Sequence, residues 1–300
     1  QTCALPISDG MVTVPEADMP VQLPSMGTGM GRAGGPVLVG DLGTLEGPIA
    51  GTLDDTHGGL GYEAWAGSDR ATMETLLQST PAATPSSAAR LLLRKLLLTI
   101  APPPPGNAAM SFNAMRVTRL LDGGLVDDAA DLAITMQAPM NAEIVRAQAD
   151  SLVYAGRDSD TCGDATATRL DSAEPYWVEL RAYCYAVTGE NAPLDLTRTV
   201  IEEQGLADPA FLTLLDGIIS GKPVAPEVIR IPDAIHIMML SRLKLPVPRD
   251  IALDSGLPAT LLAAASAETP KALRVVAAER ALRAGILPTD RKSTRLNSSH

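Results

Sequence analysis

The sequence predicts an all-α protein of stacked antiparallel helical hairpins, an α-solenoid, preceded by a Gly/Pro-rich and poorly structured segment. Four hydrophobic stretches each end in a glycine: Gly124, Gly156, Gly189 and Gly221. These glycines are 32, 33 and 32 residues apart, and the preceding stretches begin at Asn141, Pro175 and Pro209, 34 residues apart. Pro or Asn at a helix start and Gly just beyond its end is the expected asymmetry. Periods in the low thirties are typical of helix pairs that bury a core against their neighbours.

The two ends are interpreted as translated sequencing adapter. Gln1–Ile7 and Asp290–His300 match, codon for codon, the two strands of a common short-read adapter. Residues 1–8 and 290–300 are therefore excluded from fold reasoning. We expect the natural chain to continue beyond both ends of the remaining segment.

Residues 9–66 are predicted to be a flexible or loosely ordered segment. Gly and Pro are scattered through it, and no periodic apolar pattern is sustained. From Ser68 the pattern changes, because Ser68 is a candidate N-cap for an amphipathic helix over 68–78.

A second amphipathic stretch covers residues 85–100 and stops at the sequence APPPPG, because proline cannot continue a helix. Residues 67–106 are therefore predicted to be a helical pair with a Pro-rich linker. Residues 107–289 are predicted to be the helical-repeat domain.

Several residues of the repeats resemble the tetratricopeptide family, in a divergent form. Ala149 and Ala182 lie seven residues before their glycines, where that family has a small residue. Leu152 and Tyr185 lie four residues before, where it has Tyr. Ala129 also fits, whereas the second helices depart from the pattern, with Thr161 and Leu194 in place of Ala. The stretch GLGYEAWAGSDRATMETLL (59–77) is similar to uncharacterised bacterial envelope proteins with helical repeats.

Cys162 and Cys184 are the most informative pair of residues. They lie on consecutive predicted helices joined at about 171–174, and their midpoint, residue 173, falls inside that connection. In an antiparallel hairpin, residues equidistant from the turn lie side by side, so the two sulfurs are expected within disulfide reach if both face inward. Two unrelated buried thiols are the alternative. A disulfide would favour a periplasmic or other envelope location.

Other motifs have plainer explanations. GMGRAG (29–34) matches a nucleotide-binding fingerprint, but the Gly and Pro that follow it favour a linker. Asp54, Asp55 and His57 are interpreted as a polar turn rather than a metal or general-base site. His236 lies in an apolar helical stretch and is expected to be a packed residue.

Four aromatic residues gather in one predicted helix: Tyr176, Trp177, Tyr183 and Tyr185. They are candidates for contact with a partner, since aromatic anchors dominate binding energy at interfaces. Core packing between adjacent hairpins is the alternative.

Charge and hydropathy restrict the class of partner. A formal net charge of −11 repels phosphate backbones, so nucleic acid is not an expected partner. No run of 18 apolar residues predicts a membrane span. We expect no cofactor and no metal.

We therefore expect a non-enzymatic scaffold or adaptor that binds another protein or peptide in the bacterial cell envelope. The alternative is a helical accessory region of a cell-wall-acting enzyme whose catalytic domain lies outside this fragment. A passive structural role is a third possibility.

Overall fold

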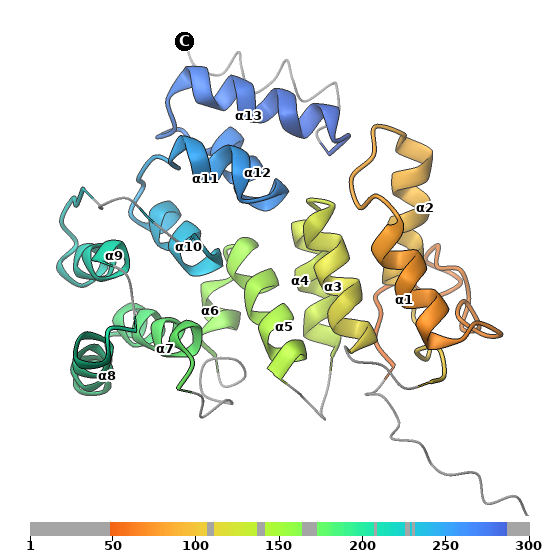
Figure 1. The fold of residues 1–300 in the computed structure, drawn as a ribbon, viewed down its shortest axis with the longest axis horizontal. Coiled ribbons are helices and arrows are strands. Elements are labelled where there is room, and N and C mark those ends of the chain that lie inside the picture. The colour runs from red at the N-terminus through yellow and green to blue at the C-terminus, as the bar shows by residue number, and fades with distance from the viewer. Residues whose placement is uncertain are drawn as a thin grey trace, which may run out of the picture. The chain divides into compact units, whose positions relative to one another are not determined.

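The computed structural model describes residues 49–106, 111–136, 142–163, 173–206, 209–225, 229 and 232–286. These residues contain helices and turns, with two isolated backbone bridges and no strand (Figure 1). The all-α fold class is therefore confirmed. Residues 1–48 and 287–300, with the motif at 29–34, lie outside the described residues.

Thirteen helices follow one another in the described part of the chain: α1 Arg70–Ser79, α2 Ser87–Leu98, α3 Phe112–Asp122, α4 Val126–Thr135, α5 Ala142–Tyr154, α6 Asp158–Thr161, α7 Pro175–Thr188, α8 Asn191–Gln204, α9 Pro209–Ser220, α10 Ala234–Arg242, α11 Arg249–Asp254, α12 Leu257–Ala265 and α13 Lys271–Arg283. Among them, no helix combines the length and hydropathy needed to cross a membrane.

The predicted helix ends agree with the structure. The four repeated glycines have left-handed backbone, with φ between 63° and 77°; they follow α7 and α9 directly, and α3 and α5 after one further residue. Only glycine adopts this conformation readily, which is why each helix stops there. One cap differs from expectation, because Asp69 rather than Ser68 caps α1. The Asp69 carboxylate accepts hydrogen bonds from the backbone N–H and the hydroxyl of Thr72.

Two hydrophobic cores lie on the two sides of α5. One is built by α1 to α5, and Trp65 lies edge-on to Phe112 in it, with ring centroids 4.9 Å apart. The other is built by α5 and α7 to α13. Ile144 and Ala147 of α5 belong to the first core, whereas Val145 and Ala149 belong to the second.

Helices distant in the sequence also pack together. α3 contacts α1, α2, α4 and α5, and it also contacts α12 from the C-terminal part of the chain. α5 contacts α10, although α7, α8 and α9 come between them in the sequence (Figure 1). α10 also contacts α9, and α9 contacts α7. In a simple linear array each repeat contacts only its neighbours. These contacts therefore add cross-connections to the predicted stack of hairpins.

The end of α13 returns to the connection between α1 and α2. A Cβ atom added to Gly285 would lie 2.3 Å from the carbonyl oxygen of Thr84. At the α3–α4 turn, a Cβ atom on Gly124 would lie 2.5 Å from Cδ1 of Ile286. The approach at Gly285 meets backbone, so only glycine permits it, whereas the atom at Gly124 is the tip of a flexible side chain. Both contacts place the end of the C-terminal helices beside the first helices.

A buried arginine joins the N-terminal segment to the first helices. Arg116 of α3 has no exposed surface, and its guanidinium donates to the carbonyl oxygens of Leu97 (2.7 Å), Thr99 (2.8 Å) and Ala50 (2.9 Å). It also donates to the Asn113 side chain at 3.1 Å. Burial lowers the pKa of Arg116 to about 10, so the group stays charged at neutral pH.

Residues 49–66 belong to the segment predicted to be loosely ordered, and they contain no helix. Ala50 and Trp65 are nevertheless buried in the first core. The backbone N–H groups of Thr52 and Leu53 donate to the carbonyl of Leu98, and Ile100 N–H donates back to Leu53. Hydrogen bonds to the end of α2 thus hold part of this segment in place.

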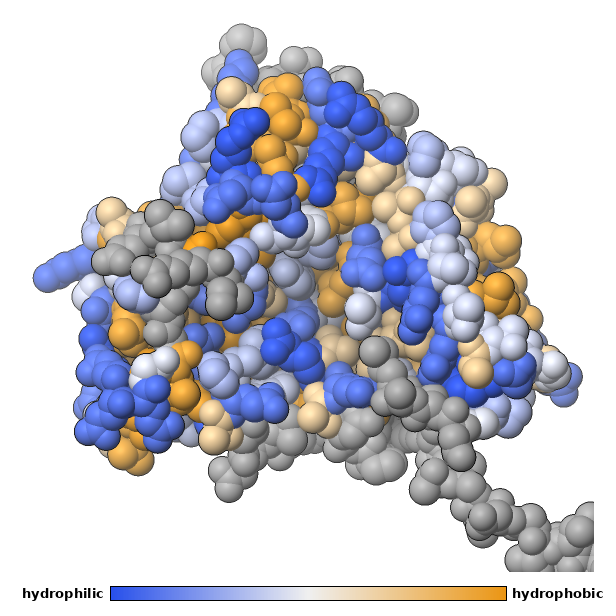
Figure 2. Space-filling view, in the orientation of Figure 1, coloured by the Kyte–Doolittle hydropathy of each residue, from blue (hydrophilic) through white to orange (hydrophobic). Residues whose placement is uncertain are grey.

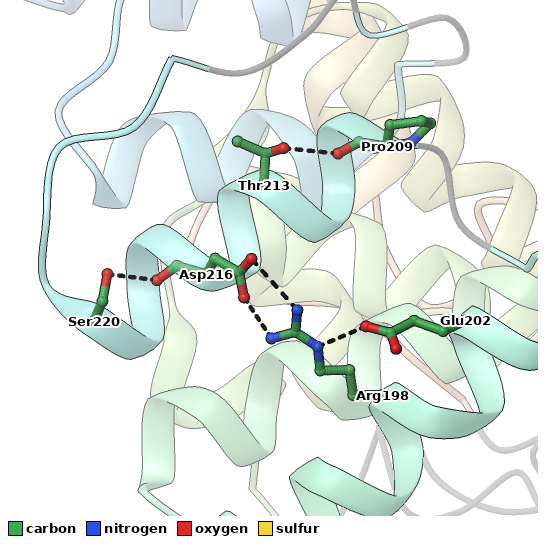
Figure 3. Close-up of polar contacts among 6 residues, drawn as sticks. All are labelled: Arg198, Glu202, Pro209, Thr213, Asp216 and Ser220. Atoms are coloured by element: carbon green, nitrogen blue, oxygen red, sulfur yellow. Dashed lines mark hydrogen bonds and ion pairs between the residues drawn. The ribbon is translucent and has the colours of Figure 1, made fainter.

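Ion pairs at the surface link α8 to α9. Arg198 of α8 donates to Glu202 on its own helix at 2.8 Å and forms an ion pair with Asp216 of α9 (Figure 3). All three side chains are substantially exposed. Exposed pairs of this kind contribute at most about 1 kcal/mol, so α8 is held mainly by its packing on α7.

Gly285→Ala tests the return of α13. Gly285 and Gly189 share a φ of 77°, but no atom lies within 4 Å of a Cβ added to Gly189. Both substitutions should lose about 1–2 kcal/mol from left-handed strain. Gly285→Ala should lose roughly 1–3 kcal/mol more, because its methyl group meets the backbone of Thr84. Equal urea midpoints for the two variants would contradict this contact.

Arg116→Met tests the buried guanidinium. It should lower the free energy of unfolding by about 3 kcal/mol, because three backbone carbonyls lose their donor. The matched control is Arg94→Met, which removes a partly exposed pair with Asp128 and should cost at most about 1 kcal/mol. Urea unfolding measures both, and similar losses would show that the carbonyl contacts contribute little.

Candidate functional site

The structure brings the predicted cysteine pair together. Cys162 directly follows α6, and Cys184 lies in α7. Their sulfur atoms are 2.05 Å apart and their Cα atoms 5.2 Å apart, as in a disulfide. The pair therefore ties the end of α6 to α7.

The four aromatic residues that are candidates for partner contact lie partly in the core and partly at the surface. Tyr176, Trp177 and Tyr183 are buried, with exposed fractions of 7%, 2% and 0%. The rings of Tyr176 and Trp177 meet edge-on at 4.9 Å inside the second core. Of the four residues, only Tyr185 is partly exposed, so the other three act in packing and a partner could reach Tyr185 alone.

The acidic turn before α1 is organised by its own side chains. Asp54 accepts hydrogen bonds from the N–H groups of Thr56 and His57 and lies 2.7 Å from Nδ1 of His57. Hydrogen bonds from Thr56 and His57 lower the pKa of Asp54 to about 2. In the described residues, no three His, Cys, Asp or Glu side chains gather as a metal site would require.

A polar cluster lies where α5 meets α7. Arg146 donates to Asp150 at 2.9 Å, and its guanidinium lies over the ring of Tyr176 at 3.3 Å from the centroid. The Tyr176 hydroxyl donates to the other oxygen of Asp150 at 2.8 Å. Burial raises the pKa of Tyr176, and the negative charge of Asp150 raises it further.

Asp233 and His236 extend this cluster to α10. Asp233 caps the helix by accepting from the His236 N–H at 3.0 Å, and its carboxylate lies 2.9 Å from His236 Nδ1. Burial raises the pKa of Asp233, but the hydrogen bonds and charge of His236 outweigh it, so the net shift is downward. Arg146 also attracts this carboxylate, whereas Asp150 is repelled by it.

A carboxylate on the Nδ1 side of a histidine is the arrangement that orients a general base. Here, however, the His236 side chain is only 3% exposed and its ring meets Phe211 in the core. A substrate has no access to such a ring. The cluster therefore acts in joining α5, α7 and α10.

A comparison of the chain with protein-family models, with curated proteins and with solved structures found no match.

The helix α2 carries apolar side chains on the side that faces away from the core. Leu91 is 51% and Leu92 58% exposed, and Ala88 is exposed beside them. With Lys95, these residues lie within roughly 100° around the helix axis. We name Ala88, Leu91, Leu92 and Lys95 the outward face of α2. In Figure 2, hydrophobic residues reach the surface on the side where Figure 1 places α1 and α2.

The opposite side of α2 is buried through Leu93 and Leu97. A helix that has leucines on both sides usually has both sides covered. The sequence RLLLRKLLL (90–98) shows that leucines occur on more than one side of the helix, but it does not show which of them pack inward. The outward face was therefore absent from the sequence-based candidates.

Lys95 lies within the outward face of α2 and has no ion pair in the described part of the chain. Its Nζ is the atom nearest to a Cβ added to Gly58, at 3.9 Å. The neighbouring Arg94, by contrast, is held by both carboxylate oxygens of Asp128, each at 2.6 Å. Arg90, the third cation of α2, lies outside this face, so Lys95 is the cation within it.

Asp233→Asn tests the polar cluster through pH. Because the folded state lowers the pKa of Asp233, its charge stabilises the fold above the ordinary pKa, and this contribution disappears as pH falls through the folded pKa. At about pH 7 the variant, which keeps a capping oxygen, should be about 1 kcal/mol less stable. The difference should shrink below about pH 4. Urea unfolding at both pH values measures it, and a constant difference would contradict the role of the charge.

Proposed function

We propose that this chain is a divergent tetratricopeptide-like repeat protein that acts as a non-enzymatic scaffold for another protein or peptide in the bacterial cell envelope. The outward face of α2 is the observation that carries the proposal. Single exposed leucines are normal on protein surfaces, whereas adjacent exposed leucines on one helix face form an apolar patch that a partner can cover.

The apolar area of this face favours a protein partner. Leu91 and Leu92 keep more than half of their surface exposed, and covering both would contribute about 2 kcal/mol. That is a modest affinity by itself, so the partner must gain contacts from neighbouring side chains.

The cysteine pair supports the proposed compartment. Disulfides persist in the periplasm and outside the cell, and they are rare in the reducing cytosol. The bond between Cys162 and Cys184 therefore favours an exported protein.

Site-specific photo-cross-linking in the organism that encodes the chain tests the proposal. A photoreactive benzoylphenylalanine replaces Leu92 in one strain and Leu196 of α8, 68% exposed, in the control strain. We expect a discrete cross-linked protein in the periplasmic fraction from position 92 and none of that size from position 196. The same product from both positions, or none from position 92, would contradict a binding role for α2.

A further inference from the structure

We infer that the partner contacts the outward face of α2 through an amphipathic helix that combines an apolar stripe with a carboxylate placed against Lys95. This inference rests on the proposed function and adds the chemistry of the partner. It follows from the shape of the face, from the position of its one cation, and from the poor fit of two other occupants.

The shape of the face favours a helix. Ala88, Leu91, Leu92 and Lys95 follow the spacing of three and four residues that forms a ridge along a helix. Over the roughly 10 Å between residues 88 and 95, such a ridge fits between the side-chain rows of a second helix. A partner helix with apolar residues at the same spacing would cover both leucines at once.

The cation determines the charge of that helix. Lys95 is four residues from Leu91 and three from Leu92, so a partner that covers the leucines also removes water from the Lys95 ammonium. An ammonium group that loses water without gaining an anion costs several kcal/mol. No acidic residue occurs in α2 between Ser87 and Leu98. The Lys95 ammonium lies beside the turn at Gly58, which follows Asp54 and Asp55, but it forms no ion pair in the described part of the chain. A carboxylate in direct contact with it therefore has to come from the partner.

A second copy of this chain fits poorly. In an antiparallel two-fold pairing of α2, Lys95 would face the first turn of the other helix, where the N-cap Ser86 and the helix dipole add positive charge. In a parallel two-fold pairing, Lys95 would face Lys95. In both arrangements, α2 of the second copy offers the ammonium no anion.

An anionic membrane surface is also disfavoured. Attraction to such a surface contributes about 1 kcal/mol for each cation near it. In α2 the side chain of Arg94 is already neutralised by Asp128, and the whole chain has a formal net charge of −11. Arg90 and Lys95 together do not offset that repulsion.

The test measures the binding of two synthetic helical peptides to the full chain by fluorescence anisotropy. Both peptides carry the same leucine stripe over about 18 residues, a length that supports a helix; glutamates flank it in one and lysines in the other. We expect the glutamate peptide to bind at least about tenfold more tightly, a difference of 1.4 kcal/mol. Lys95→Glu should reverse this preference.

Leu92→Asp should weaken the binding of the glutamate peptide by at least about tenfold, whereas Leu196→Asp should leave it unchanged. Circular dichroism establishes that each variant is folded. If Leu92→Asp and Leu196→Asp weaken binding equally, the proposed function fails together with this inference.

Other results overturn the inference alone. Three results would contradict a partner carboxylate against Lys95: equal affinity for the two peptides, no binding of either, or no reversal of the preference in Lys95→Glu. Cross-linking at position 92 would still decide the proposed function. Dimers in sedimentation that Leu92→Asp dissociates would identify a second copy as the occupant. Flotation with phosphatidylglycerol vesicles that depends on Leu92 would identify a membrane.

Discussion

A single guanidinium group determines how the first third of the described chain is arranged. Arg116 is inaccessible to water, and the charge of its guanidinium is solvated by three backbone carbonyls rather than by a carboxylate. Those carbonyls belong to three places in the chain, namely residue 50, the last turn of α2 and the residue that follows it. Moving any of them away would leave a buried charge poorly solvated, which costs far more than an apolar contact. The arginine therefore fixes the angle of α2 against α3 and holds the preceding segment beside it.

The orientation of α2 explains its surface. With the C-terminal turn of α2 held by Arg116, Leu93 and Leu97 point into the first core, and Leu91 and Leu92 are left outside. The other end of the helix lies beside Gly285, where the chain returns after α13. Contacts at both ends thus hold α2 in place. A rigid helix loses little conformational entropy on binding, which suits a contact surface.

The second core depends on polar contacts of a different kind. The Arg146–Asp150–Tyr176 cluster and the Asp233–His236 pair join α5, α7 and α10, which are not consecutive in the chain. Each charged group there has a partner of opposite charge or a hydrogen bond, so burial is tolerated. The disulfide adds a covalent tie between α6 and α7. Perturbed pKa values in this region therefore reflect packing, although such values often mark catalytic sites.

The sequence by itself determined the local structure. Glycine at a helix end and proline at a helix start restrict the backbone of the residues next to them, so the boundaries of α7 and α9 could be predicted. The pairing of the two cysteines could be predicted as well, from their equal distance to the expected turn. Only the tertiary structure decided which face of each helix is covered. The packing of α10 on α5 and of α12 on α3, the burial of Tyr183 and the exposure of Leu92 depend on contacts between distant residues. The periodicity of one helix cannot encode these contacts, because it shows that a face is apolar but not which helix covers it.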